Sequence, residues 1–316
     1  MERIEKAIDS LLIDTNKEIF SRIEEIAFEL DIENTSSKGY CYALKIDGNN
    51  NLRLQELIEF IDTKIVDYAI PKKEIDKARE HFIETGSTSK IISLKKQAVS
   101  LFTELKNTGE GGELLLYILT LEILKIPQLI SKMSLKTSGQ LHYQGSDGIH
   151  VNYNSVSKTL DLYWGESKMY EDVNSAINKC FTSLNGFLLD PMSHSSTQER
   201  DLILITQNIN NNVNNPEFEE LIVEYFDKDS ELSNRLVYKG ICFIGYDMKA
   251  YKELNKTKTI DNIKDDIQNE LQSHYGRISE RIKNFPLLDT KEIHVFLMPF
   301  PSVSEFRKYY LETLNL

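Results

Sequence analysis

The stretch DGIHVNYNSVSKTLDLYWGESK, residues 147–168, decides the fold because it predicts two paired strands. Apolar and polar side chains alternate at 149–153 and again at 160–164, which is typical of β-strands. A loop that closes symmetrically between these segments places Asp147 opposite Glu166. The facing pairs in this register are Tyr153–Leu160, Val151–Leu162, Ile149–Trp164 and Asp147–Glu166. The sequence therefore predicts a β-hairpin with two opposed carboxylates at its open end.

Three charged side chains are expected to meet at that open end. Lys168 lies two residues beyond Glu166, so it projects from the same face if the strand continues. Two carboxylates at this separation repel each other unless a cation lies between them, and such oxygen ligands suit Mg²⁺ or Mn²⁺. Asp147, Glu166 and the main-chain carbonyl of Ser167 are the expected metal ligands, and Lys168 would orient or deprotonate a water. The set predicts metal-dependent phosphodiester cleavage.

A further acid comes from a helix that precedes the hairpin. This helix is expected from about Gly112 to Lys125, ended by Pro127, and it is apolar nearly all round, which indicates burial. Glu113 lies in its first turn, where the helix dipole favours a carboxylate. Glu113 is either part of the site or only a stabiliser of the helix end, and Glu110 is the weaker candidate.

The rest of the chain predicts an α/β or α+β fold, with a central mixed sheet flanked by helices. Helices are expected at 3–30, 52–69, 71–84, 90–107, 170–189, 198–209, 216–227, 260–283 and 303–314, and further strands at 40–46, 236–246 and 292–298. The last two strands are long unbroken apolar runs, which indicates burial on both faces. The polar segment 86–90 is the expected boundary between a mainly helical N-terminal region, 1–90, and the core, 91–316.

The composition and net charge of the chain argue against some classes of protein. The chain has 316 residues, is 41% apolar, and carries a net charge of −12. Its charged N-terminus and the absence of a long apolar run predict a cytoplasmic protein with no membrane contact. Such an acidic chain is not expected to grip nucleic acid over a long surface by itself. Lys132 and Lys136, near the acidic cluster, are either local nucleic-acid contacts or a solvated surface.

The order acid, hairpin, Glu-x-Lys and helix resembles the PD-(D/E)xK nuclease superfamily, with its restriction-endonuclease-like core. Three segments carry a more specific resemblance, to the HamA family of nuclease subunits from Hachiman anti-phage systems: GEGGELLLY (109–117), IPQLISKMSLKTSGQLHYQGSDGIHV (126–151) and LYWGESKMY (162–170). The close match covers roughly residues 108–185. Ser146 stands where the superfamily often has proline before the aspartate.

This resemblance implies roles and a partner. Asp147, Glu166 and Lys168 take the places of the two metal ligands and the catalytic lysine, and Glu113 takes that of the acid on the preceding helix. It also implies a helicase subunit, HamB, beside a nuclease that acts on DNA. Two other hypotheses stay open: a non-catalytic interaction subunit of a nucleic-acid-processing complex, and a stand-alone restriction-type endonuclease.

Overall fold

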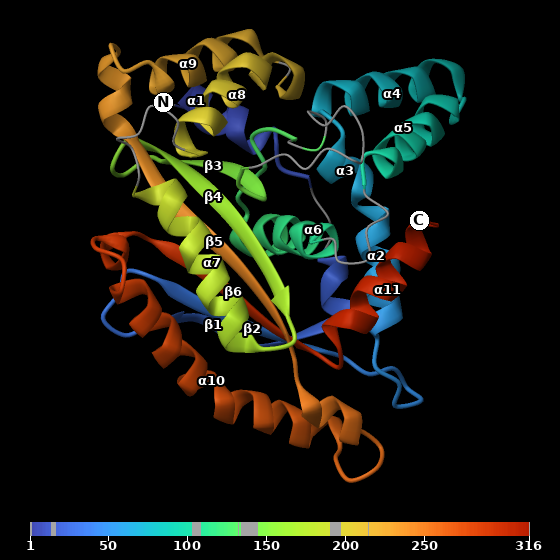
Figure 1. Ribbon diagram of the computed structural model, residues 1–316. Coiled ribbons are helices and arrows are strands. Elements are labelled where there is room, and N and C mark those ends of the chain that lie inside the picture. Colours follow the sequence, from blue (N-terminus) through green and yellow to red (C-terminus); the bar gives the residue numbers. More distant parts are fainter. Residues whose placement is uncertain are drawn as a thin grey trace.

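The computed structural model describes residues 2–13, 17–102, 109–131, 133, 145–189, 197–213 and 215–315. A six-stranded mixed sheet lies at the centre, in the order β1-β2-β6-β5-β4-β3 (Figure 1). Its strands are β1 (Ile23–Asp31), β2 (Lys38–Leu44), β3 (Gly148–Asn154), β4 (Thr159–Tyr170), β5 (Leu236–Asp247) and β6 (Ile293–Phe300). The four inner strands, β2, β6, β5 and β4, pair in parallel, and β1 and β3 form antiparallel edges. The predicted α/β class is confirmed.

Helices surround this sheet in the described part of the chain. They are α1 (Glu2–Asp9), α2 (Leu54–Thr63), α3 (Ile65–Ala69), α4 (Lys72–Thr85), α5 (Ser89–Ser100), α6 (Glu110–Leu119), α7 (Val173–Leu188), α8 (Thr197–Asn212), α9 (Pro216–Phe226), α10 (Ile260–Lys283) and α11 (Val303–Leu314). Among the described residues, no helix has the length and apolar character needed to cross a membrane.

The hairpin has the register that the sequence predicts. Ile149 pairs with Trp164, Val151 with Leu162 and Tyr153 with Leu160. The side-chain oxygen of Asn154 accepts hydrogen bonds from the two loop N–H groups of Val156 and Ser157, at 3.0 and 3.1 Å, which fixes the turn. The ladder ends at Gly148 opposite Gly165, one position short of Asp147 and Glu166.

Helices cover both faces of β4. Trp164 stacks on Phe187 of α7, with ring centroids 5.8 Å apart, so its side of the strand faces α7, which crosses the sheet in Figure 1. The neighbouring Gly165 faces α6 so closely that a Cβ there would lie 2.9 Å from Leu116. Because side chains alternate along a strand, Glu166 and Lys168 project on the α7 side, and Ser167 projects on the α6 side.

The structure corrects one predicted element at the N-terminus. The expected helix at 3–30 is wrong beyond its first turns, because Ile23–Asp31 forms the edge strand β1. Its pairing with β2 is irregular between Glu25 and Leu30, and Glu29 has a positive φ of 51°. These irregularities break the two-residue alternation that marks a strand. The boundary at residue 90 stays a prediction, although β1 and β2 belong to the same sheet as the hairpin.

The helix that carries Glu113 changes its winding before it ends. α6 spans Glu110–Leu119 and continues as a π-helical turn, Thr120–Leu124. Lys125 then takes a left-handed conformation with φ 57°, just before Pro127. The predicted helix from about 112 to 125 is therefore confirmed, and it lies buried against β4.

Candidate active site

Asp147 lies at the point where β3 separates from β4. Its main-chain N–H donates to the carbonyl of Gly165 at 2.8 Å, which continues the hairpin by one bond. Its carboxylate then turns to the neighbouring strand, where Oδ2 accepts the N–H of Ser167 at 2.8 Å. Asp147 is thus anchored beside Glu166, because its carboxylate binds the main chain of Ser167, the residue after Glu166.

Glu166 and Lys168 lie on one face of β4, as their spacing predicts. The ammonium of Lys168 contacts Oε1 of Glu166 and donates to the carbonyl of Ser167 at 3.2 Å. The Glu166 side chain is 4% exposed and that of Lys168 is 23% exposed. The carboxylate of Glu166 and the carbonyl of Ser167, two of the expected metal ligands, therefore converge on one positive charge.

Burial and the charge of Asp147 have the largest effects on the pKa values of Glu166 and Lys168. Burial, followed by repulsion from Asp147, raises the pKa of Glu166 to about 8, while contacts with Lys168 and Ser183 act in the opposite direction. For Lys168, burial lowers the pKa, but attraction to Asp147 and Glu166 outweighs it and the net shift is upward. Two acidic side chains and one ammonium thus act on each other as a single electrostatic unit.

Glu113 reaches this group from the opposite face of the sheet, through a tyrosine. The hydroxyl of Tyr68, on α3, donates to Oε2 of Glu113 at 3.1 Å and lies 3.4 Å from the main-chain oxygen of Asp147. Tyr68 is buried, and burial together with Glu113 and Asp147 raises its pKa far above the ordinary value, so it remains a donor. Glu113 is therefore joined to Asp147 by one hydroxyl, and Glu110, its neighbour on α6, is buried.

On the β3 side, no strand among the described residues pairs with β4 beyond Gly165, because β3 has ended. Charged side chains bond its main-chain groups instead. Asp147 takes the N–H of Ser167, Lys168 donates to the carbonyl of Ser167, and Arg307 of α11 donates from Nη2 to the carbonyl of Met169 at 2.6 Å. Neither Tyr68 nor Arg307 is predicted by the sequence, since each reaches the site from a helix far away in the chain.

The predicted residues differ in how the structure places them. Asp147, Glu166, Ser167 and Lys168 come together, and Glu113 is linked to them through Tyr68. Lys132 and Lys136 lie outside the described residues, so their role as nucleic-acid contacts stays a prediction. Across the described ranges, no three His, Cys, Asp or Glu side chains form a group that could hold a metal ion by themselves.

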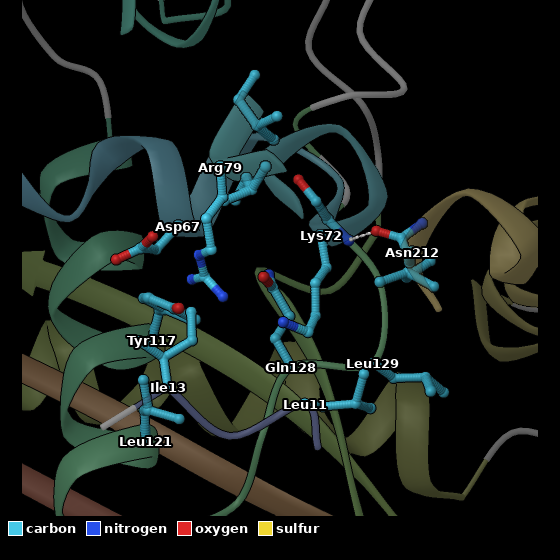
Figure 2. Close-up of a pocket in the computed structure, with 14 residues that line it drawn as sticks. Leu11, Ile13, Asp67, Lys72, Arg79, Tyr117, Leu121, Gln128, Leu129 and Asn212 are labelled. Carbon is cyan, nitrogen blue, oxygen red and sulfur yellow. Dashed lines mark hydrogen bonds between the residues drawn. The ribbon is translucent and has the colours of Figure 1, made fainter. Parts of the chain in front are cut away.

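A separate pocket is lined by residues of α3, α4 and α6, among others (Figure 2). Asp67, the neighbour of Tyr68, lines it together with Lys72 and Arg79 of α4 and Tyr117 of α6. Figure 2 shows the guanidinium of Arg79 pointing toward Asp67 and Tyr117. None of the candidate site residues lines this pocket, so the carboxylates at the hairpin mouth belong to a different surface.

The chain was compared with known proteins. The HamA family model matches residues 17–314, which is nearly the whole length and includes every candidate site residue. The search of curated proteins gives no match. The family match extends well beyond the roughly 108–185 segment that the motifs cover. The chain therefore belongs to the HamA family of Hachiman defence proteins.

Proposed function

We propose that this protein is a Mg²⁺- or Mn²⁺-dependent deoxyribonuclease that acts in Hachiman defence together with a helicase subunit. One observation supports the proposal above the others. Asp147 and the Glu166-Ser167-Lys168 segment gather at the mouth of one hairpin, with Asp147 bonded to the N–H of Ser167 at 2.8 Å and Lys168 in contact with Glu166.

The donor atoms at the hairpin mouth fit a hard divalent cation. Asp147, Glu166 and the carbonyl of Ser167 offer oxygen atoms alone, which Mg²⁺ and Mn²⁺ prefer. Mg²⁺ is commonly held by one or two protein carboxylates, with water and substrate phosphates completing its shell. Two carboxylates and a carbonyl are therefore a sufficient set, even though no third acidic side chain joins them in the described part of the chain.

Different residues of the protein would have separate roles in hydrolysis. At such a site a divalent cation supplies charge neutralisation at the phosphate and a water of lowered pKa. Lys168, held at the rim by Glu166 and the carbonyl of Ser167, would orient that water and offset negative charge as the bond breaks. Tyr68 and Asp147 would hold Glu113 toward the same point from α6.

We propose a helicase partner because the chain itself is strongly acidic. The net charge of −12 makes broad contact with the phosphate backbone unfavourable for this chain alone. A partner that binds and unwinds DNA would supply that contact and deliver a strand to the hairpin mouth. The HamA family match places the chain in a defence system, where such an assembly has a use.

The test is degradation of plasmid and linear DNA by the chain with its neighbouring helicase, in Mg²⁺, in Mn²⁺ and in chelator. Glu166→Ala and Lys168→Ala are the site variants. Glu253→Ala is a control, because this acid ends the 3-10 helix Lys249–Glu253 and its carboxylate accepts a hydrogen bond from Thr257. We expect cleavage by the parent and the control, and a loss of at least a hundredfold in both site variants.

Each other result points to a different function. Metal binding without hydrolysis of any DNA or RNA, with or without the helicase, would favour a non-catalytic interaction subunit. Cleavage at defined sequences by the isolated chain would favour a stand-alone restriction-type endonuclease. Undiminished cleavage by both site variants would remove the hairpin mouth from the reaction.

A further inference from the structure

Arg307 is a charged side chain for which the proposed chemistry has no role so far. It lies on α11, partly buried, and its Nη2 donates to the carbonyl of Met169 at 2.6 Å. Its Nε is buried and has no hydrogen-bond partner. No carboxylate in the described ranges forms an ion pair with it, whereas the neighbouring Lys308 pairs with Glu312 at 3.8 Å. Arg307 is thus a cation with donor capacity left over.

The position of Arg307 follows from the free edge of β4. On this edge Lys168 donates to the carbonyl of Ser167, and Arg307 donates to the carbonyl of Met169, two residues further along the strand. Residues two apart on a strand are separated by roughly 7 Å. The two carbonyls that hold these cations are therefore about as far apart along the strand edge as successive phosphates in a nucleic-acid strand.

The packing of α11 holds Arg307 at this place. Phe306, its neighbour, is buried and lies so close to α6 that a Cβ on Gly111 would come within 2.9 Å of its ring. Tyr310, one turn later on α11, contacts the same glycine. The same helix α6 carries Glu113, so α11 is fixed to the element that supplies the further acid. Because its position is already fixed, this guanidinium loses little conformational entropy when it binds an anion.

We propose that Arg307 binds the substrate phosphate next to the one at the hairpin mouth, and so sets the path of the strand along the free edge of β4. This inference rests on the proposed function, because it takes a phosphodiester chain as the ligand. A guanidinium offers several N–H donors in a planar fork, which suits phosphate oxygens. The simpler alternative is that Arg307 only caps the carbonyl of Met169 and stabilises the end of the strand.

The experiment distinguishes the effect of the Arg307 charge from the effect of its hydrogen bond to the carbonyl of Met169. Arg307→Gln keeps an N–H donor for that carbonyl but removes the charge, and Arg307→Lys keeps the charge. Arg277→Gln is the matched control, since Arg277 is exposed on α10 and donates to Asn174 at 2.8 Å. All variants carry Lys168→Ala so that DNA stays intact in Mg²⁺. Binding of a fluorescent single-stranded DNA by each variant, together with the neighbouring helicase, is measured by anisotropy over a series of salt concentrations.

We expect Arg307→Gln to lower the slope of log affinity against log salt by about 0.7, the value for one phosphate contact on a single strand, and to weaken binding about fivefold at 0.1 M salt. Arg307→Lys and Arg277→Gln should keep the slope of the Lys168→Ala chain. An unchanged slope in Arg307→Gln, or equal losses in the Gln and Lys variants, would each overturn the inference.

The two proposals fail in different ways. A chain that binds DNA with an Arg307-dependent slope, yet never hydrolyses it under any metal or partner, would overturn the nuclease function and leave the phosphate contact standing. A chain that cleaves DNA but binds it equally well with the Arg307→Gln substitution would overturn only the role of Arg307. Thermal melting of every variant identifies losses that come from unfolding.

Discussion

The hydroxyl of Tyr68 donates to Oε2 of Glu113 at 3.1 Å, and so connects α3 to the acid at the start of α6. The same oxygen lies 3.4 Å from the main-chain oxygen of Asp147. One buried, uncharged hydroxyl therefore links the acid on α6 to Asp147 at the hairpin mouth. This relationship makes Tyr68 a positioning residue for the proposed reaction.

Tyr68→Phe tests this positioning. The ring stays and the hydroxyl is lost, so we expect about 1 kcal/mol of lost stability and roughly a tenfold lower rate of DNA cleavage. Tyr40→Phe is the matched control, because Tyr40 lies on β2, three strands away from β4, and loses a hydroxyl contact of 3.0 Å to His294. Cleavage rates and melting temperatures are compared. Equal cleavage by the Tyr68→Phe and Tyr40→Phe variants would show that the Tyr68 hydroxyl does not matter for the reaction.

Gly112→Ala tests how closely α6 must approach β4. A Cβ at this position would lie 2.6 Å from Oγ of Ser167 and 3.1 Å from Met169, so we expect a loss of about 1–3 kcal/mol in the free energy of unfolding. Gly276→Ala, in α10, meets nothing within 4 Å and should stabilise the chain by about 0.5–1 kcal/mol. Both are measured by urea unfolding. Adding Ser167→Ala should recover part of the loss, and no recovery would contradict the clash.

The stability that two buried histidines contribute should fall as the solution is acidified from neutral pH, whereas the raised pKa of Glu166 acts in the opposite direction. Burial lowers the pKa of His150 and of His274 to about 4, below the ordinary value near 6.5, and Arg277 adds to the shift of His274. These histidines therefore take up protons first in the unfolded chain, so their contribution to stability is complete above pH 6.5 and is lost between 6.5 and 4. The expected loss by pH 5 is on the order of 1–2 kcal/mol per histidine.

The measurement is urea unfolding of the parent and of His274→Phe at pH 7 and pH 5. Neither ring nitrogen of His274 has a hydrogen-bond partner, and the ring packs edge-on against Tyr246, so phenylalanine keeps the contact. Glu270, with its carboxylate 3.7 Å from Nε2, opposes the loss by attracting the charged form. The His274→Phe variant should lose less stability on acidification than the parent, and an equal loss in both would contradict the assignment.

Lys239→Met tests a buried ion pair at the other end of the sheet. The ammonium of Lys239 lies 2.8 Å from Asp161 and 2.8 Å from Glu292, and Asp161 is 2% exposed. Removing the lysine leaves a buried carboxylate without its cation, at a cost of about 3–5 kcal/mol. Asp161→Asn in the same chain should restore most of this loss. Thermal and urea unfolding of the single and double variants measure the difference.

The hairpin register and the meeting of charged side chains at its mouth follow from the sequence for a physical reason. The alternation at 149–153 and 160–164 fixes which side chains share a face, and a short symmetric loop fixes the register. Asp147, Glu166 and Lys168 therefore fall together once the hairpin forms. The inner strands β5 and β6 are predicted because long apolar runs mark strands buried on both faces.

Other features depend on contacts that no local pattern records. β1 carries irregular pairing and a positive φ at Glu29, and its apolar residues also fit a helical spacing, so the sequence predicts a helix there. Tyr68 lies 45 residues before its partner Glu113, and Arg307 lies 138 residues after Met169. Such partners meet only because the sheet and its helices bring distant segments together.

The pairing of β2 with β6 has a consequence for synthesis of the protein. β2 ends at Leu44 and its parallel neighbour begins at Ile293, so a ribosome adds roughly 250 residues between them, which takes about 12–50 s at usual rates. During that interval the hydrogen-bonding edge of β2 has no partner from its own chain. The cell must therefore shield this edge during translation. A truncated chain that lacks β6 would expose the edge to pairing with a strand of another molecule.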